Sequence, residues 1–382
     1  MKLGYVTIYD AQNIRNYSGT GYYLAKSLED VGIEVFYIGG LKLYSRCIYR
    51  AKERLYKRIF NRIYIPERNP RVLKHYAKQI SERLKIEKAD VLLSPSSIPL
   101  TLMDTKIPMV IYPDAIFSGM IDFYSNFTNL SKETIKDGHW QEQEMLNRAS
   151  LAVFSSEWAA NTVKSSYTID ESKIKVLPYG ANIESTRNEE DIERLLNKKK
   201  SSVCKLLFIG VDWKRKGGKI ALGVTNLLNN EMGIPTELII AGCIPPDSDK
   251  LPHYVKTYGF IDKSSQSGKN LINRLNEESH FLILPSEADC TPIVFAEANS
   301  FGIPCITKDV GGISSLITNG MNGIALNAKA GIEEYAKFIK DSFQNYENYR
   351  ALAITSFREY QNRLNWSVTG NKLKEMLAGL VK

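Results

Sequence analysis

The sequence has no long hydrophobic run. Its longest apolar stretches, FLILP at 281–285 and ELIIA at 237–241, fall far short of the roughly 18 residues that predict a membrane-spanning helix. The first residues, MKLGYVTIYDA, contain one Lys and then alternate apolar and polar side chains, which predicts a first strand and not a signal peptide. We therefore expect a cytoplasmic protein with nothing that targets it for export.

Cysteine and histidine are scarce as well. No CxxC pair or Cys/His cluster has the spacing of a metal site, so structural zinc is not expected. Reduced, mostly buried thiols are expected at Cys47, Cys204, Cys243, Cys290 and Cys305. Of the four His, His139 and His280 stand beside apolar residues and are interpreted as structural. We predict a metal-independent protein.

What is present is a chain long enough for two domains. It has 382 residues, 43% of them hydrophobic, and a formal net charge of +8. The charge is local: residues 42–88 contain fifteen Lys or Arg against four Glu, which is +11, so the rest of the chain carries −3. The net charge therefore belongs to one segment of the chain.

Within this basic region the apolar residues mark one face of a helix. They recur at steps of three and four, at Tyr44, Ile48, Ala51, Leu55, Ile59 and Ile63. The other side carries the cations Arg46, Arg50, Arg54, Lys57 and Arg58. Such a basic amphipathic helix fits the surface of an anionic membrane or a nucleic-acid phosphate backbone, and the alternative is an ordinary helix with a solvated outer face.

Strand-like and helical patterns alternate along the whole chain, which is typical of parallel, doubly wound α/β sheets. Strands are predicted at 2–10, 33–39, 90–94, 108–113, 151–156, 173–178, 204–210, 236–242, 258–261, 280–285, 303–307 and 323–326. Helices are predicted at 21–31, 70–86, 132–149, 157–166, 216–230, 267–278, 292–301, 330–343, 345–361 and 366–379. Between the two series, the polar segment 184–202 is interpreted as a linker or surface segment.

The fold class that follows is α/β, with two Rossmann-like, doubly wound domains facing a cleft. We place the first domain at 1–183, the linker at 184–202, the second domain at 203–360 and a C-terminal helix at 361–382. The C-terminal helices are candidates to cross back to the first domain. Ligands of such sheets bind beyond the carboxyl ends of the strands, where loops enter helix N-termini.

The most informative segment is HFLILPSEADCTPIVFAEANSFGIPCI at 280–306. A buried strand ends at Pro285, and a helix is predicted to begin with Thr291 as its N-cap and Pro292 at its first position. Asp289 precedes this helix and Glu297 follows eight residues later. An anionic diphosphate at the helix start, with hydroxyl-rich groups for the two carboxylates, would match all of these features.

These motifs resemble the family-four retaining glycosyltransferases of the GT-B fold. The resemblance rests on the PS-x-x-D-x7-E pattern from Pro285 to Glu297, the Gly-rich turn SGTG, and the segments FIGVDWKRKGG and DVGGISSLITNGMNG. It covers essentially all of the chain and is strongest over 204–326.

The resemblance implies a donor site in the second half of the chain. Glu297 matches the residue that holds the ribose hydroxyls of the nucleotide. Asp289 matches the residue that contacts the transferred sugar, which is usually Glu in the family. Lys216 matches the Lys that neutralises the diphosphate. Val211 stands where an Arg is common, which makes Arg215 or Lys214 the candidate second cation. The backbone that cradles sugar and phosphate would be Cys290, Thr291, Pro292 and Ile293, with Thr291 and Pro292 in place of two glycines.

In the first half, the resemblance assigns the glycine turn near the diphosphate to Gly19, Thr20 and Gly21, for which a plain helix-entry turn is the alternative. Asp114 follows a predicted strand, in the segment YPDA at 112–115. The family often has a His directly before this Asp, but here that position is Pro113. Asp114 is therefore the candidate near the anomeric carbon, and a simple turn residue is an equal alternative. Ser315 occupies a position that is often Glu, a change without an explanation.

The implied reaction is transfer of a sugar, with retention, from a UDP- or GDP-linked donor to an acceptor hydroxyl, without a cofactor or metal. Asp114, Lys216 and Asp289 are the candidate catalytic residues. The basic region suggests a glycan acceptor that is lipid-linked, in the envelope or otherwise polyanionic, with peripheral contact to an anionic membrane at its inner face. A nucleic-acid acceptor, a sugar-nucleotide epimerase and a non-catalytic sugar-nucleotide-binding subunit remain the alternatives.

Overall fold

The computed structural model describes residues 1–200, 202–246 and 248–381. They form two compact units of similar architecture: unit 1 comprises 1–178 and 369–382, and unit 2 comprises 179–368. Within the described residues, no helix combines the length and apolar character needed to cross a bilayer.

Unit 1 is built on a six-stranded parallel sheet with the order β2-β1-β3-β4-β5-β6. Its strands are β1 (Lys2–Val6), β2 (Glu34–Ile38), β3 (Val91–Ser94), β4 (Met109–Ile111), β5 (Leu151–Phe154) and β6 (Ile174–Val176). In the register, Leu3 lies opposite both Val35 and Val91. The central strands are short apolar runs because helices cover both of their faces.

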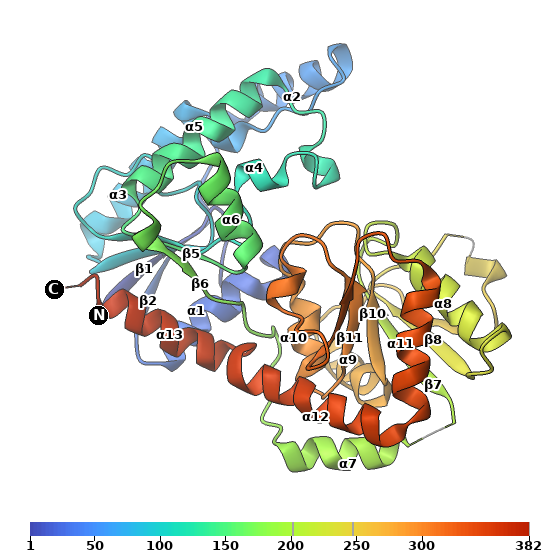
Figure 1. The fold of residues 1–382 in the computed structure, drawn as a ribbon. Helices are drawn as coiled ribbons and strands as arrows, with labels where there is room; N and C mark the ends of the chain where they lie inside the picture. Colours follow the sequence, from blue (N-terminus) through green and yellow to red (C-terminus); the bar gives the residue numbers. More distant parts are fainter. Residues whose placement is uncertain (201, 247, 382) are drawn as a thin grey trace. The chain divides into compact units, whose positions relative to one another are not determined.

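The two helical layers of unit 1 are visible in Figure 1. One face carries α3 (Pro70–Ile86), α5 (Lys132–Arg148) and α6 (Glu157–Ser166), whose apolar residues join the sheet in one core. The other face carries α1 (Thr20–Asp30) and α13 (Trp366–Ala378). The remaining helical segments are α2 (Arg46–Ile59), α4 (Phe117–Met120), η1 (Asn16–Gly19), η2 (Pro66–Arg68), η3 (Ser125–Phe127) and η4 (Glu171–Lys173).

Helix α13 confirms that the C-terminus crosses back to the first domain. From Thr369 onward it belongs to unit 1, where a Cβ atom on Gly370 would lie 2.6 Å from the Ser27 carbonyl oxygen. The Lys374 ammonium donates to the Val31 carbonyl oxygen at 2.6 Å. The end of the chain is therefore packed against α1.

Unit 2 repeats the parallel sheet with the order β12-β11-β10-β7-β8-β9. The strands are β7 (Cys204–Ile209), β8 (Thr236–Ala241), β9 (Val255–Thr257), β10 (Phe281–Leu284), β11 (Cys305–Lys308) and β12 (Gly323–Leu326). The helices are α7 (Glu189–Lys199), α8 (Gly218–Asn230), α9 (Gln266–Glu278), α10 (Ile293–Asn299), α11 (Ile332–Gln344) and α12 (Tyr346–Arg363), with short turns η5 (Ser248–Lys250) and η6 (Ile313–Ser315).

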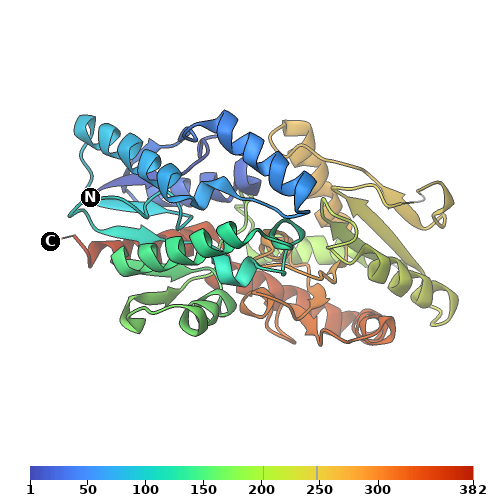
Figure 2. The same cartoon turned by 90° about the horizontal axis from the view of Figure 1, so that it is seen from above.

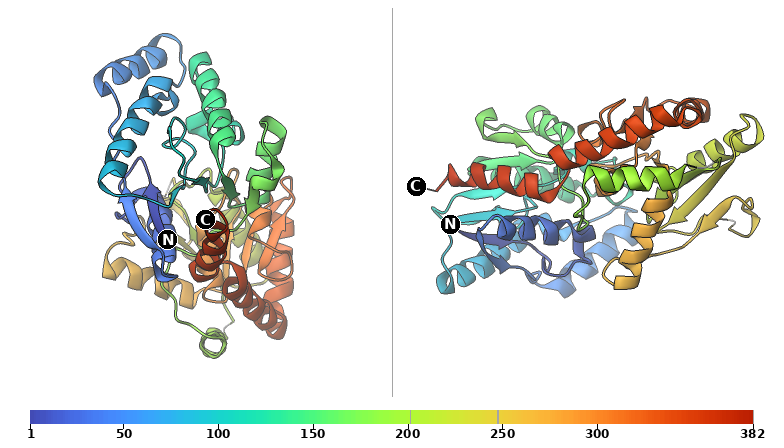
Figure 3. Two further views of the ribbon diagram at one scale, coloured as in Figure 1. Left: turned by 90° about the vertical axis from the view of Figure 1, so that its left-hand side faces the viewer. Right: turned by 90° about the horizontal axis from the view of Figure 1, so that it is seen from below.

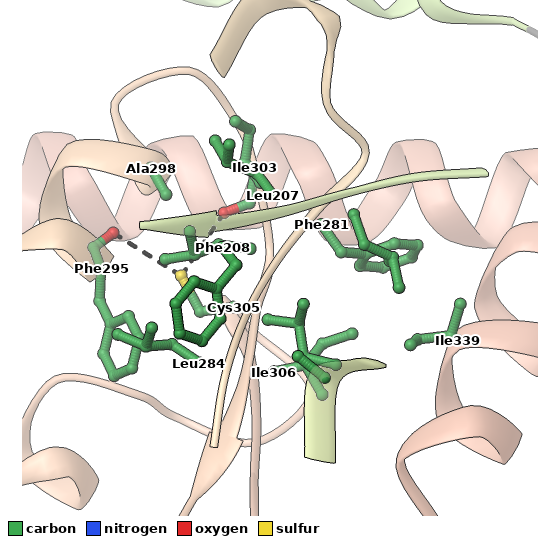
Figure 4. Packing of buried hydrophobic residues seen from close by; sticks show 14 of the residues in the cluster. Leu207, Phe208, Phe281, Leu284, Phe295, Ala298, Ile303, Cys305, Ile306 and Ile339 are labelled. Atoms are coloured by element: carbon green, nitrogen blue, oxygen red, sulfur yellow. Dashed lines mark hydrogen bonds between the residues drawn. The ribbon is translucent and has the colours of Figure 1, made fainter. Parts of the chain in front are cut away.

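The core of unit 2 lies around β7, β10 and β11 (Figure 4). Cys305 is buried there, and its thiol approaches the Phe295 carbonyl oxygen at 3.7 Å. Burial raises the pKa values of the Cys305 and Cys204 thiols, so both act as small apolar side chains, as predicted. Cys47, in contrast, is exposed.

Two segments differ from the sequence-based prediction. Residues 184–202 contain α7, which lies beside α12 (Figure 3) and buries Ile192 and Leu196 in the core of unit 2. The ninth strand is β9 at Val255–Thr257, so the prediction of a strand at 258–261 is wrong. Gly259 takes a φ of +61°, which turns the chain there, and β9 is a mostly exposed edge strand without an apolar run.

Candidate functional site

The loop between β7 and α8 lies against the end of β10. Gly217 has a φ of +78°, and a Cβ atom there would lie 2.1 Å from the Pro285 carbonyl oxygen. A Cβ atom on Gly210 would lie 2.9 Å from Cγ of Lys216. Glycine at both positions therefore lets the loop close onto the strand end with the Lys216 side chain in between.

Lys216 and Asp289 meet at this point. The Lys216 ammonium donates to Asp289 Oδ2, and both side chains are largely buried. The Ser286 hydroxyl donates to the same oxygen at 3.3 Å, and the Gly312 amide donates to the Asp289 carbonyl oxygen at 3.2 Å. A buried charge is stable only when it is paired, so each of these two groups holds the other in the site.

Arg215 supplies a second cation on the same loop. Its guanidinium Nη1 lies 3.9 Å from Asp289 Oδ2 and donates to the Ala288 carbonyl oxygen at 2.8 Å. The neighbouring Lys214 is exposed, as is Val211. Of the two candidates for the second cation, the structure places Arg215 at the cluster.

The helix after this loop begins one residue later than predicted. Pro292, with ψ of 98°, is the N-cap of α10 and the first helical residue is Ile293, so the assignment of Thr291 as the N-cap is corrected. An extended ψ at Pro292 keeps it outside the helix. Cys290, Thr291 and Pro292 are buried at the entry to the helix.

Glu297 lies in the second turn of α10 and has a partner that the sequence did not indicate. The Lys263 ammonium pairs with Glu297 Oε2 at 2.5 Å, and the carboxylate is buried. Similarly, buried Lys308 pairs with Glu287 at 2.6 Å beside the same loop. Sequence reasoning missed both lysines because no local spacing links them to their partners.

In unit 1, the loop between β1 and α1 has an unusual backbone. Tyr17, Ser18 and Gly19 all adopt left-handed conformations, with φ of 49°, 54° and 84°. Gly19 is then the N-cap of α1, and a Cβ atom on Gly21 would lie 2.4 Å from the Tyr9 hydroxyl oxygen. Thr20 is the first helical residue, and all three residues of the predicted glycine turn are buried.

Asp114 follows β4 and lies beside that loop. The Tyr17 hydroxyl donates to Asp114 Oδ1 at 2.7 Å, and the rings of Tyr17 and Tyr9 stack with centroids 6.0 Å apart. Burial, and secondarily the Asp114 charge, raise the pKa of Tyr9 well above its usual range. The structure thus brings Asp114 and the glycine turn together, through a tyrosine that the sequence analysis did not single out.

Sequence comparison finds a family match within unit 2. Residues 188–357 match the family described as Glycosyl transferases group 1. The match covers most of unit 2, and this part of the chain resembles the family. Among curated proteins, the chain is similar to a D-inositol 3-phosphate glycosyltransferase of Paenarthrobacter aurescens (strain TC1), with 23% identity over 63% of this chain and 61% of the relative. An Escherichia coli UDP-Gal:alpha-D-GlcNAc-diphosphoundecaprenol alpha-1,3-galactosyltransferase is 25% identical over 41% of this chain and 42% of the relative.

Solved structures show that the chain has the GT-B fold. The sucrose-phosphate synthase of Thermosynechococcus elongatus has a TM-score of 0.71 at 13% identity, with 100% of this chain and 99% of that chain covered. The Anabaena protein HepE, solved with UDP and glucose, has a TM-score of 0.65 at 16% identity, with 99% and 100% covered. The resemblance of the chain to GT-B glycosyltransferases is confirmed.

Proposed function

We propose that this protein is a retaining, hexosyltransferase-type glycosyltransferase that moves a sugar from a nucleotide-diphosphate donor to an acceptor hydroxyl. The observation that carries the proposal is the cluster of Lys216, Arg215 and Asp289 at the carboxyl ends of β7 and β10. Two cations and a carboxylate at such strand ends can bind a diphosphate and a hydroxyl-rich sugar next to each other.

Donor binding in this proposal is an exchange of partners. The diphosphate takes over the Lys216 ammonium, and hydroxyls of the sugar donate to Asp289, so neither buried charge loses its compensation. Glu297 exchanges Lys263 for the ribose hydroxyls. The backbone of Cys290, Thr291, Pro292 and Ile293 contacts the sugar and phosphates.

The chemistry then depends on stabilising the departing diphosphate. The bond between the anomeric carbon and the phosphate oxygen breaks, and Lys216 and Arg215 compensate the charge that develops on that oxygen. The same oxygen accepts the proton of the attacking hydroxyl on the front face of the donor, which retains the configuration. No side-chain nucleophile is required, and Asp114, with Gly19, Thr20 and Gly21, is assigned to the sugar and diphosphate from unit 1.

For the acceptor, the proposal is a glycan of the envelope or a lipid-linked glycan. The E. coli relative's name specifies a UDP-linked donor and a diphosphoundecaprenol acceptor, which supports both a UDP-sugar and a lipid-linked glycan here. The basic region 42–88 in unit 1 agrees with a polyanionic acceptor. The site of action would be the cytoplasm, at the inner face of the membrane.

A donor panel tests the proposal. Thermal shifts with UDP, GDP, ADP and their sugars would identify the stabilising donor, and hydrolysis and transfer assays would follow with that donor. We expect Glu297→Ala to weaken nucleotide binding in calorimetry. Activity should persist in EDTA, because Lys216 and Arg215, and not a metal ion, compensate the charge of the diphosphate in this proposal; abolition by EDTA would contradict metal independence.

Lys216→Met is the sharpest variant for the mechanism. Loss of its charge should lower kcat/KM by about 100-fold or more, the usual effect of removing one preorganised charge from a transition state. Lys214→Met removes an exposed cation two residues away and is the matched control, for which near-normal kcat/KM is expected. Equal activities of the two variants would remove Lys216 from the mechanism.

The panel also separates the competing functions. Nucleotide-sugar binding without hydrolysis or transfer would indicate a non-catalytic subunit, which Val211 and Pro113 in place of Arg and His favour. Conversion of the donor to another nucleotide sugar without an acceptor would indicate an epimerase. Transfer to nucleic acid would change the acceptor but keep the donor site.

A further inference from the structure

The apolar face of α2 is turned to solvent. Of the residues that define this face in the sequence, Ile48, Ala51, Leu55 and Ile59 lie in α2 and are all exposed, whereas Tyr44 and Ile63 lie beyond its ends. Ile48 and Ile59 keep 67% and 65% of their surface accessible, and Phe60 directly after the helix keeps 58%. An amphipathic helix normally buries this stripe, so its exposure indicates a binding surface.

A different face holds α2 in place. Tyr49 and Tyr56 stack on Tyr64, and the Tyr49 hydroxyl donates to Asn69 Oδ1 at 2.9 Å. The Lys52 ammonium pairs with Glu133 of α5 at 2.5 Å. Figure 2 looks down on α2, α3 and α5, which occupy the same side of unit 1. These aromatic and polar contacts anchor the helix, and its apolar stripe is left at the surface.

The cations of α2 lie next to this stripe. Residues 46–59 carry six Lys or Arg against one Glu, and the five cations other than Lys52 are exposed. On a helix with 3.6 residues per turn, Arg46, Arg50, Arg54, Lys57 and Arg58 fall on an arc beside Ile48, Leu55 and Ile59. An aliphatic stripe bordered by cations is the chemical profile of a helix that lies in the plane of an anionic bilayer surface.

We propose that α2 binds the surface of an anionic lipid bilayer. Ile48, Leu55, Ile59 and Phe60 enter the boundary between headgroups and acyl chains, and the arc of cations contacts the lipid phosphates. A nucleic-acid backbone would also attract the cations, but it offers no apolar phase for exposed aliphatic side chains. The proposal rests on α2 alone and is independent of the donor reaction.

The role of the apolar side chains of α2 is tested by sedimentation of the full chain with vesicles of phosphatidylcholine, with and without phosphatidylglycerol. The protein should bind the anionic vesicles. The triple variant Ile48→Ser, Leu55→Ser and Ile59→Ser should weaken that binding by about tenfold or more, because three aliphatic side chains no longer leave water. Ile86→Ser, at an isoleucine on α3 that is 86% exposed, is the matched control and should bind normally.

The role of the α2 cations is tested by a second pair of variants. Replacing the five exposed cations of α2 by Gln should abolish most binding to anionic vesicles, whereas replacing the five exposed cations of α3, Arg71, Lys74, Lys78, Arg83 and Lys85, should leave most of it. Circular dichroism and the thermal shift with the nucleotide show whether each variant keeps its fold and donor site.

Two results would overturn the membrane proposal. One is the absence of binding to anionic vesicles, or equal binding by the wild type and the triple serine variant. The other is binding to duplex DNA that falls steeply with salt and survives the serine substitutions, together with no vesicle binding. Neither result would affect the donor panel, so failure here and failure of the proposed glycosyl transfer can be told apart.

Discussion

His280 is a buried imidazole with both ring nitrogens engaged. Nδ1 lies 3.0 Å from the Lys205 amide and therefore accepts its hydrogen, which leaves Nε2 as the donor to the Lys199 carbonyl oxygen at 2.9 Å. Burial lowers the pKa of His280 to about 4, and the charges of Lys199 and Lys205 act in the same direction. This geometry agrees with the sequence-based interpretation of His280 as a structural residue.

The shift makes stability depend on pH. Between the unfolded value near 6.5 and the folded value of about 4, the unfolded chain binds the proton and the native chain does not, so the free energy of unfolding falls as pH decreases through this window. The contribution lost is up to roughly 3 kcal/mol. His280→Gln, whose amide can accept and donate in the same two directions, should reduce the loss measured by urea unfolding at pH 4.5 and 7.

The control for this prediction is His253→Gln, which removes an exposed histidine and should keep the wild-type pH dependence. An unchanged pH dependence in His280→Gln would show that other groups cause the acid sensitivity.

Site residues could be predicted from the sequence where they belong to a short motif. Lys216 and Asp289 were found from motif positions, and the structure pairs them. Lys263 and Tyr17 were not found, because their partners Glu297 and Asp114 are brought to them only by the fold. A contact between residues 34 or 97 positions apart leaves no periodicity in a single sequence.

Among the elements, strands and helices with strong apolar periodicity were predicted closely. The helices at 70–86 and 157–166 have the predicted bounds. Helix α7 was missed because its apolar residues are few, although Asn188 and Asp191 form a capping box and the helix has acidic residues in its first turn and lysines in its last. Those terminal signals would have identified it.

The contact between the β7–α8 loop and β10 depends on Gly217. Gly217→Ala should destabilise unit 2 by roughly 3 kcal/mol or more, because the new Cβ atom meets the Pro285 carbonyl oxygen in addition to the unfavourable positive φ. It should also move Lys216 and thereby weaken the thermal shift by the donor. Calorimetry of the variant measures the first effect, and the donor panel measures the second.

Gly233→Ala and Gly320→Ala separate the two causes. Both glycines have a positive φ, 68° and 79°, but neither has an atom within 4 Å of the added Cβ. These controls should each cost only about 1 kcal/mol and keep donor binding. A cost for Gly217→Ala no greater than theirs would mean that the loop can move away from Pro285.

At the scale of the whole chain, the sequence located the positive charge correctly but not the boundaries of the two units. The +11 of residues 42–88 lies entirely in unit 1, as the sequence indicated. The boundary predicted near 183 and the separate helix predicted at 361–382 differ from the units observed, which change at 178 and again at 368 within α13. Helical periodicity continues through α13, so the sequence gives no sign of the second change.

Unit 1 should therefore depend on a helix from the far end of the chain. Leu373 and Leu377 of α13 are fully buried, and replacing both by Ala should cost about 2–5 kcal/mol for each site. Hydrogen exchange measured by mass spectrometry should then become faster in α1, which α13 contacts through Gly370 and Lys374, while β7 and β10 of unit 2 stay protected. Lys372→Ala, on the exposed side of the same helix, should leave the exchange unchanged. Equal protection of α1 in the double variant and the wild type would show that unit 1 is stable without the packing of α13.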